Sequence, residues 1–369
     1  MQEIRLPFKV KKEVLACGAD LKGGFCFARG DRAYLSNGFG DLSQADNFEK
    51  YQKEIKRAQR AYKLKPKVIA CDLHPGYFST KFAQSYCGPR SLPCRQAGTV
   101  HGPRYIQHHH AHIASCMVDN GIKGKVIGVS FDGTGFGTDG NIWGGEILLA
   151  GYKKFDRLFH LDYAPMPGGE IAIKEPWRMA VSYLYKTYKD NFKNIGIPFL
   201  EKIDKDKCNV ITHMIKNGIN SPLTSSMGRL FDGVSSLIGL KDVVRFEAEA
   251  AIELEKIADA ECSKSYKGIT IEEIIRGIVN DLKKKEKTSI ISAKFHNTIA
   301  QLVKKVALRA KVREGAEKIV FSGGVFQNKY LVARLKGLFN GSEVKIYFHK
   351  DFFTTDSSIA LGQIAIANG

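Results

Sequence analysis

The chain contains one arrangement of residues twice, and this duplication restricts its possible folds more than any single motif does. The first copy is the apolar run 14–18, followed by Asp20, a glycine turn and alternating aromatic residues. The second copy is the apolar run 126–131, followed by Asp132, a glycine turn and the segment 146–149. Short apolar runs bounded by turn residues predict buried strands. The repeat of strand, aspartate, glycine turn and strand therefore predicts two related lobes.

The segments around the two copies alternate between helical and extended patterns. Helices are predicted at 47–62, 292–312 and 328–338, and strands at 67–72, 318–321 and 344–348. This alternation, with glycine-rich turns at strand ends, predicts an α/β fold with largely parallel inner strands.

Two such halves suggest the duplicated architecture of actin, sugar kinases and heat-shock ATPases, the ASKHA fold with ribonuclease H-like lobes. In that architecture a nucleotide lies in the cleft between the lobes. The predicted first lobe spans residues 1–124 and the second spans 125–369, with a helical insertion at about 158–240.

The bulk composition is that of a globular protein, with 44% hydrophobic and 25% charged residues among 369. No apolar run is long enough to predict a spanning helix, and the first residues do not resemble a secretory signal. The eight cysteines form no CxxC pair, which favours a reduced, cytoplasmic protein. Cys87 and Cys94 flank the loop CGPRSLPC and could pair or bind metal, although plain loop thiols are the simpler interpretation.

The net charge of +18 favours an anionic partner, such as a nucleic acid, a nucleotide or an acidic protein. A lysine-rich solvated surface is the more common explanation. The lysines occur in short runs, and no aromatic-interleaved RNA-binding motif is present. Charge alone therefore does not identify the partner.

Two glycine-rich turns are candidates for binding phosphate. The strings FDGTGFGTDG, at 131–140, and SGGVFQN, at 322–328, both follow predicted strands. Glycine lets backbone N–H groups approach an anion closely, and a following helix adds its positive end. Either turn alone is a weak signal, but the two together predict a nucleotide site. The chain lacks the P-loop pattern GxxxxGK[ST].

Four of the ten histidines lie within five residues, in the string IQHHHAHIAS. His108 and His112 are separated by one helical turn, but His109 and His112 are also near neighbours on a helix, so spacing does not choose between these pairs. A carboxylate from elsewhere would complete a set of two histidines and one carboxylate around a divalent cation. Asp356 is the candidate, although an aspartate before a final helix is also an ordinary N-cap. The HxxxH spacing lacks the glutamate of HExxH proteases, which argues against a protease.

Several long motifs occur in the order found in one family. They are DLHPGYFST, QHHHAHIAS, FDGTGFGTDGNIWGGE, PGGEIAIKEPWRMA, FSGGVFQN and the terminal ALGQ. From about residue 14 to its end, the chain resembles the carboxy-terminal, TsaD-like (Kae1-like) domain of HypF carbamoyltransferases, which act in hydrogenase maturation.

This resemblance implies a set of site residues. The implied metal ligands are His108, His112 and Asp356, around Fe²⁺ or Zn²⁺, with a ligand set that leans towards iron. The residues implied to hold ATP or AMP, as carbamoyl-adenylate, are Asp132, Gly133, Gly135, Gly137, Asp232, Glu247, Gly323, Gly324 and Asn328. Asp132 or His110 is the expected proton acceptor.

The resemblance also implies a reaction. A carbamoyl group would pass from carbamoyl-adenylate to the C-terminal cysteine thiol of a HypE-like acceptor protein. The sequence does not include the domains that precede this region in HypF, so it is expected to be a split subunit or a fragment. A separate YrdC-like subunit or domain would make the adenylate. Two alternatives remain: a tRNA threonylcarbamoyladenosine-forming enzyme, although tRNA is not expected as the partner, and an inactive nucleotide-binding partner subunit. The sequence departs from the family where NDGG reads Thr355-Asp356-Ser357-Ser358 and where EGQAA reads Glu247-Ala248-Glu249-Ala250-Ala251.

Overall fold

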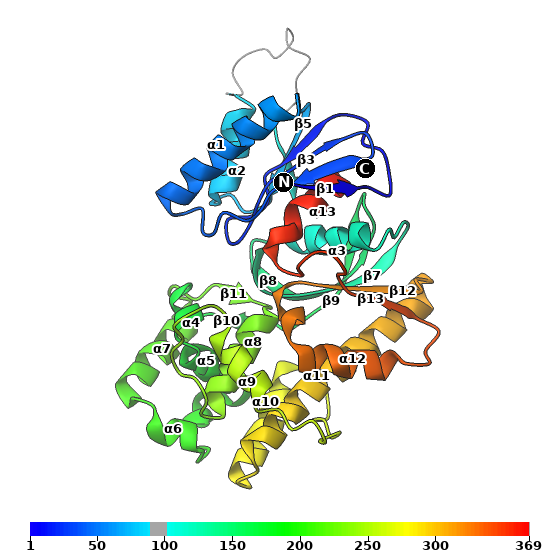
Figure 1. Ribbon diagram of the computed structural model, residues 1–369. Coiled ribbons are helices and arrows are strands. Elements are labelled where there is room, and N and C mark those ends of the chain that lie inside the picture. The colour runs from blue at the N-terminus through cyan, green and yellow to red at the C-terminus, as the bar shows by residue number, and fades with distance from the viewer. Residues whose placement is uncertain (89–101, 369) are drawn as a thin grey trace.

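The computed structural model describes residues 1–88 and 102–368, which form two lobes (Figure 1). Cys94 lies outside the described residues, and so does the interpretation of Cys87 and Cys94 as plain loop thiols. Among the described helices, none combines the length and the hydrophobicity needed to cross a membrane.

The first lobe is built on a six-stranded sheet in the order β1-β4-β3-β2-β5-β6. The neighbouring strands from β1 through β4 and β3 to β2 pair antiparallel. The strands β2, β5 and β6 pair parallel. The bounds are β1 Gln2–Arg5, β2 Val14–Ala16, β3 Cys26–Arg29, β4 Arg32–Leu35, β5 Val68–Asp72 and β6 Arg104–Ile106.

The second lobe is built on a seven-stranded sheet in the order β10-β11-β8-β7-β12-β13, with β9 paired to β8. Here β7, β12 and β13 run parallel, whereas β7, β8 and β9 pair antiparallel. The bounds are β7 Val126–Phe136, β8 Ile142–Ala150, β9 Phe155–His160, β10 Ala164–Pro165, β11 Leu223–Thr224, β12 Lys318–Ser322 and β13 Lys345–Tyr347.

The two sheets share one topology. The order β4-β3-β2-β5-β6 corresponds strand by strand, and direction by direction, to β9-β8-β7-β12-β13. This correspondence confirms the predicted duplicated α/β fold. The hydrophobic core of each sheet comes from the apolar runs that the sequence showed, since all residues of β2 and β5 and the first seven of β7 are buried.

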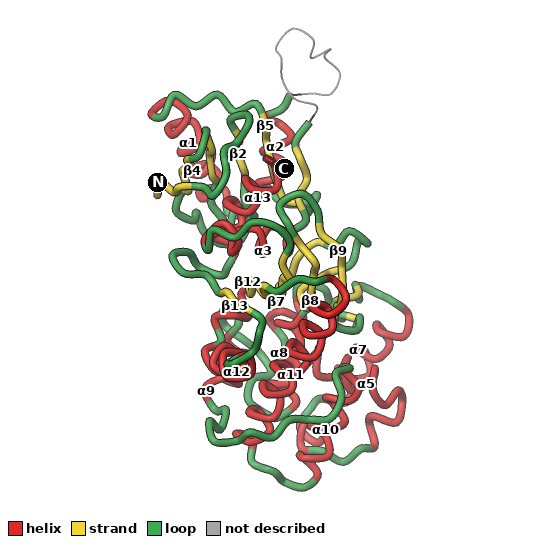
Figure 2. The backbone as a smooth tube through the Cα atoms, turned by 90° about the vertical axis from the view of Figure 1, so that its right-hand side faces the viewer, coloured by secondary structure: helices red, strands yellow, loops and turns green. Residues whose placement is uncertain are grey.

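Most helices of the second lobe lie at the end of the molecule remote from the first sheet (Figures 1 and 2). The helical block runs from α4 to α10 and so extends beyond the predicted range 158–240, because α10 also buries an isoleucine-rich face and packs against α5. The bounds are α4 Ile171–Lys174, α5 Trp177–Tyr188, the 3₁₀ helix η1 Lys189–Asn194, α6 Pro198–Lys202, α7 Lys205–Asn217, α8 Met227–Leu237, α9 Glu249–Lys256 and α10 Ile271–Lys283.

The remaining helices cover the sheets or join the lobes. Their bounds are α1 Ala45–Ala61, α2 Phe78–Tyr86, α3 His108–Asp119, α11 Thr288–Glu314, η2 Gly324–Gln327, α12 Lys329–Phe339, η3 Asp356–Ser358 and α13 Ile359–Asn368. The helix α3 contacts β7, β8 and β12 of the second sheet and also α13, so it lies at the junction of the two lobes.

The last helix belongs structurally to the first lobe, although the predicted boundary placed it in the second. Figure 1 shows α13, in red, beside the blue strands of the first sheet. Its apolar side chains are buried with those of β2 and β5. Gln363 fixes it there, because its Oε1 accepts from Gly18 N at 2.8 Å and its Nε2 donates to Gly18 O at 3.1 Å.

Candidate metal and nucleotide site

Four side chains from three parts of the chain converge at the junction of the lobes. His108 and His112 come from α3, Asp132 from β7 and Asp356 from the start of η3, and one ligand atom of each lies within 4.8 Å of all the others. The Nε2 atom of His112 is 3.1 Å from Asp132 Oδ2 and 3.3 Å from Asp356 Oδ1. The corresponding distances from His108 Nε2 are 3.3 and 3.6 Å. The structure thus brings together the three predicted ligands and adds Asp132 to them.

A buried carboxylate behind His108 fixes the orientation of its ring. Asp72, at the end of β5, places its Oδ2 2.8 Å from His108 Nδ1, and its Oδ1 accepts from His74 N at 2.9 Å. If Nδ1 donates to Asp72, Nε2 is left with its lone pair towards the cluster. Asp72 opens the motif DLHPGYFST, but no role was predicted for it. Its position at the end of the predicted strand 67–72 was the available signal.

The electrostatics of the cluster are those of a cation site. Burial works to lower the pKa of His108, but the carboxylates of Asp72 and Asp356 raise it well above its ordinary value. Burial works to raise the pKa of Asp132, yet the hydrogen bonds with His108 and His112 hold it well below its usual range. Protons on the imidazoles neutralise the negative charge of the carboxylates here, and a bound cation would neutralise it in their place.

The donor set fits a first-row divalent metal. Two imidazole nitrogens and two carboxylate oxygens suit iron or zinc, and a histidine backed by a carboxylate is the usual outer arrangement of such sites. The residues that would hold the ion are His108, His112, Asp132 and Asp356.

The other two histidines of the string point away from the cluster. His110 Nε2 is 2.6 Å from Gly151 O, and its ring packs 5.0 Å from that of Phe155. A residue two positions from each ligand faces the other side of a helix, so the expected proton-accepting role of His110 finds no support in this geometry. His109 Nδ1 is 3.0 Å from Gln107 Nε2, which leaves the pair His108 and His112 facing the carboxylates.

A cavity of about 310 Å³ adjoins the cluster at Asp132. Six of the residues implied to bind the nucleotide line it: Asp132, Gly133, Asp232, Glu247, Gly324 and Asn328. Asp132 Oδ1 accepts from Gly133 N at 2.8 Å and from Gly324 N at 3.2 Å, so the two glycine-rich segments of the sequence meet at this carboxylate. Gly323 supports the turn, since its φ of 101° and its contact with Phe131 O leave no room for a Cβ atom.

Gly135 and Gly137 do not line this cavity. The strand β7 continues to Phe136, so Gly135 lies in a strand rather than in a phosphate-binding turn. A Cβ atom at Gly135 would lie 2.5 Å from His109 Cε1 and 2.9 Å from His108 Cδ2. At Gly137 it would lie 2.2 Å from Trp143 Nε1. Close packing requires these two glycines, and the nucleotide prediction for them finds no support here.

Two cations that sequence reasoning missed also line the cavity. Arg229 Nη2 lies 2.7 Å from Asp232 Oδ2, and both side chains are 5% exposed. The spacing of three residues on a helix was the available signal for this pair. Lys22, from the loop between β2 and β3, lies 2.5 Å from Glu247 Oε2 and so connects the two lobes at the cavity.

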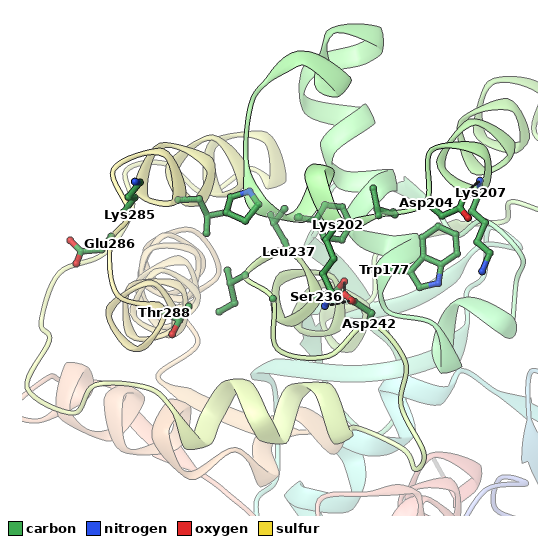
Figure 3. A pocket seen from close by; sticks show the side chains of 16 residues that line it. Trp177, Lys202, Asp204, Lys207, Ser236, Leu237, Asp242, Lys285, Glu286 and Thr288 are labelled. Carbon is green, nitrogen blue, oxygen red and sulfur yellow. Dashed lines mark hydrogen bonds and ion pairs between the residues drawn. The ribbon is translucent and has the colours of Figure 1, made fainter.

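A larger cavity, of about 500 Å³, lies in the helical block and shares no lining residue with the first (Figure 3). Its lining combines apolar side chains with charged ones, and the ion pair of Lys202 with Asp242 lies between Leu237 and Trp177 in the view of Figure 3. No residue of the metal cluster reaches it, so it is separate from the candidate site.

Comparison with known proteins assigns both lobes to one family. Residues 9–119 match the HypF Kae1-like domain, and residues 128–363 match the carbamoyltransferase, Kae1-like domain, second subdomain. The chain belongs to the HypF family. Carbamoyltransferase HypF of Synechocystis sp. is 33% identical over 98% of this chain and 48% of that protein. A carbamoyltransferase HypF homolog of Cupriavidus necator is 30% identical over 96% of this chain and 91% of that protein.

Solved HypF structures have the same fold. A full-length HypF in the phosphate- and nucleotide-bound form has a TM-score of 0.90 and 39% identity, covering 100% of this chain and 57% of that one. HypF of T. kodakarensis has a TM-score of 0.87 and 27% identity, covering 99% of this chain and 48% of that one. The chain spans about half the length of most of the curated relatives it matches. These matches confirm the resemblance to the carboxy-terminal Kae1-like domain of HypF that the sequence motifs predicted.

Proposed function

We propose that this chain transfers a carbamoyl group from carbamoyl-adenylate, held in the 310 Å³ cavity, to the C-terminal cysteine thiolate of a HypE-like protein. One observation carries the proposal: Asp132 belongs both to the metal-ligand cluster and to the cavity lining. A cation and a nucleotide bound at these places would therefore be neighbours. The HypF family of the chain supports the same reaction class.

In this proposal the chain binds, orients and stabilises, and the partner supplies the nucleophile. The thiolate sulfur attacks the carbamoyl carbon, the bond from that carbon to the phosphate oxygen breaks, and AMP leaves. No Cys, Ser, Thr or Tyr is among the described residues that line the cavity. A bound divalent cation would supply positive charge for the oxygen of the departing phosphate.

The protein groups near the reacting centre have separate tasks. Asp72 holds the ring of His108, and the N–H groups of Gly133 and Gly324 hold the carboxylate of Asp132. Glu247 lies at the cavity wall, where it is available to the nucleoside hydroxyls. Asp132 is a poor candidate for the proton acceptor, because its lowered pKa makes it a weak base.

The test is transfer with a complete set of substrates. The purified chain, loaded with Fe²⁺ or Zn²⁺, would be mixed with a YrdC-like adenylating protein, ATP, carbamoyl phosphate and a HypE protein. Mass spectrometry would detect one carbamoyl group on the HypE C-terminal cysteine. Asp356→Asn is expected to lose both the bound metal, measured by elemental analysis, and the transfer.

The matched control is Asp351→Asn, an exposed aspartate in the segment before η3 and outside the cluster. It is expected to keep metal and activity. Full metal retention and transfer in Asp356→Asn would contradict the assigned ligands. A wild-type chain that binds AMP without any transfer would instead support the inactive-partner alternative.

A further inference from the structure

Arg229 is a buried cation whose hydrogen-bonding capacity is largely unused. It is 4% exposed and lies in the first turn of α8, in the wall of the cavity that Asp132 also lines. A guanidinium carries five N–H donors, and burying it is unfavourable unless they find partners. Among the described residues, Asp232 is the partner of its Nη2, and its Nε is buried without one.

The first turn of α8 is fixed against the segment that carries Asp132. Ser226, the N-cap residue, accepts from Arg229 N at 3.1 Å and donates to Gly133 O at 2.6 Å. A Cβ atom at Gly228 would lie 2.9 Å from the Cα atom of Gly133, so the approach requires glycine. The positive end of α8 and the guanidinium of Arg229 therefore share one wall of the cavity, beside a metal-ligating residue.

The charges of the cavity single out Arg229 as its anion-binding group. Four carboxylates line the cavity, from Asp132, Asp232, Glu247 and Glu255, against the two cations Lys22 and Arg229. Lys22 is 53% exposed and already paired, so solvent weakens its attraction for a ligand. Arg229 is shielded from water, where the same charge acts more strongly.

We propose that Arg229 and the N-terminal turn of α8 form the subsite for the phosphate of the adenylate. The planar guanidinium suits phosphate oxygens, and Asp232 acts as a positioning residue that holds it in place. The inference rests on the proposed function, since it takes AMP as the leaving group. In this subsite the phosphate contacts Arg229, which lies outside both glycine-rich segments. Asp232 then holds Arg229 and does not itself contact the nucleoside.

The experiment compares AMP with adenosine, which differ only in the phosphate. Arg229→Gln alone would leave Asp232 buried and unpaired, so the informative pair is Asp232→Asn against the double variant Asp232→Asn/Arg229→Gln. Dissociation constants for AMP and for adenosine would be measured by calorimetry on each purified protein. Arg229→Lys, which keeps the charge and loses the planar fork, provides a variant with a smaller perturbation.

The double variant is expected to bind AMP about 10- to 100-fold more weakly than Asp232→Asn, as for the loss of a charged hydrogen bond. Its affinity for adenosine should change less than about 3-fold, which also shows that the cavity is folded. Arg229→Lys should give an intermediate loss for AMP alone. Equal losses for both ligands, or none, would overturn the subsite while leaving the proposed function intact. A wild-type chain that binds neither ligand would overturn both.

Discussion

The carboxylate of Asp72 lies 2.8 Å from Nδ1 of His108, and both side chains are completely buried. The Nδ1 atom of His112 has no such partner among the described residues. The two histidines are therefore held differently: Asp72 fixes the ring of His108 from its Nδ1 side, whereas His112 has polar partners only at Nε2, from Asp132 and Asp356. Asp72 also accepts from His74 N, so its two oxygens serve two donors.

This arrangement predicts the effect of Asp72→Asn. An asparagine can accept with only one side-chain oxygen, so its amide nitrogen must oppose either His108 Nδ1 or His74 N. We expect metal affinity to fall about 10- to 100-fold, as when other outer carboxylates are removed. Competition with a chelator would measure it. Asp46→Asn, exposed on the same lobe, should leave the affinity unchanged, and unchanged affinity in Asp72→Asn would contradict the role of Asp72.

Gly135→Ala is predicted to weaken metal binding although Gly135 is not a ligand. The added methyl group would overlap the rings of His108 and His109, at 2.9 and 2.5 Å, and must displace them. Overpacking of this kind costs about 1–3 kcal/mol, so an affinity loss of about 10-fold is expected. Gly337→Ala, where no atom lies within 4 Å, is the control and should retain wild-type binding. An effect on AMP affinity alone, with metal binding unchanged, would instead restore the nucleotide role of Gly135.

How far the sequence predicts this site depends on how local each interaction is. The repeated strands were predictable because an apolar run signals burial wherever it occurs. Asp20 and Asp132 were aligned on that basis, and each accepts from backbone N–H groups that follow the parallel neighbour of its own strand. Asp20 accepts from Phe78 N and Ser79 N, after β5, and Asp132 accepts from Gly324 N, after β12. Only Asp132 also reaches the histidines, and that depends on how α3 packs on β7, which no local pattern specifies.

His110 and Arg229 show two reasons why the sequence did not predict the whole site. From the sequence alone, His110 could serve as a proton acceptor as well as its neighbours could. The structure shows that its ring lies on the other side of α3, where it faces Gly151. Arg229 lies in α8, where every residue is buried, and its spacing from Asp232 predicts an ion pair but no position beside a cavity. Residues that act through distant partners therefore required the structure.

The folded state should lose stability in acid through His296. Its Nδ1 is 2.8 Å from Ser292 O and its Nε2 is 2.9 Å from Asn328 Nδ2, so the ring is neutral. Burial lowers its pKa from 6.5 to about 4. The unfolded chain therefore binds the proton first, and the free energy of unfolding should fall as pH decreases from 6.5 towards about 4.

The expected contribution is about 1.4 kcal/mol per pH unit, or about 3 kcal/mol over that range. Urea unfolding at several pH values would measure it as the difference between wild type and His296→Gln, which should have a shallower pH dependence. His213→Gln, at an exposed position, is the control. Parallel curves for wild type and His296→Gln would contradict the assignment.

Gln363→Ala should destabilise the first lobe, because Gln363 in α13 bonds to the backbone of Gly18 in that lobe. It removes both hydrogen bonds to the Gly18 backbone and leaves a buried N–H and C=O without partners. Together with the cavity, this should cost about 3 kcal/mol or more of unfolding free energy. Chemical denaturation would measure the loss, and Gln301→Ala, on the exposed face of α11, should change stability by less than about 0.5 kcal/mol. A similar small effect at Gln363 would show that α13 is held by its apolar contacts alone.

The placement of α13 sets an order of events during synthesis. The strands of the first lobe leave the ribosome before the helix that completes their core, and before Asp356. Part of the apolar surface of these strands therefore stays uncovered until α13 has emerged. The four-residue cluster is likewise incomplete until Asp356 has been made, so a nascent chain interrupted before residue 356 should have neither this cluster nor a finished first lobe.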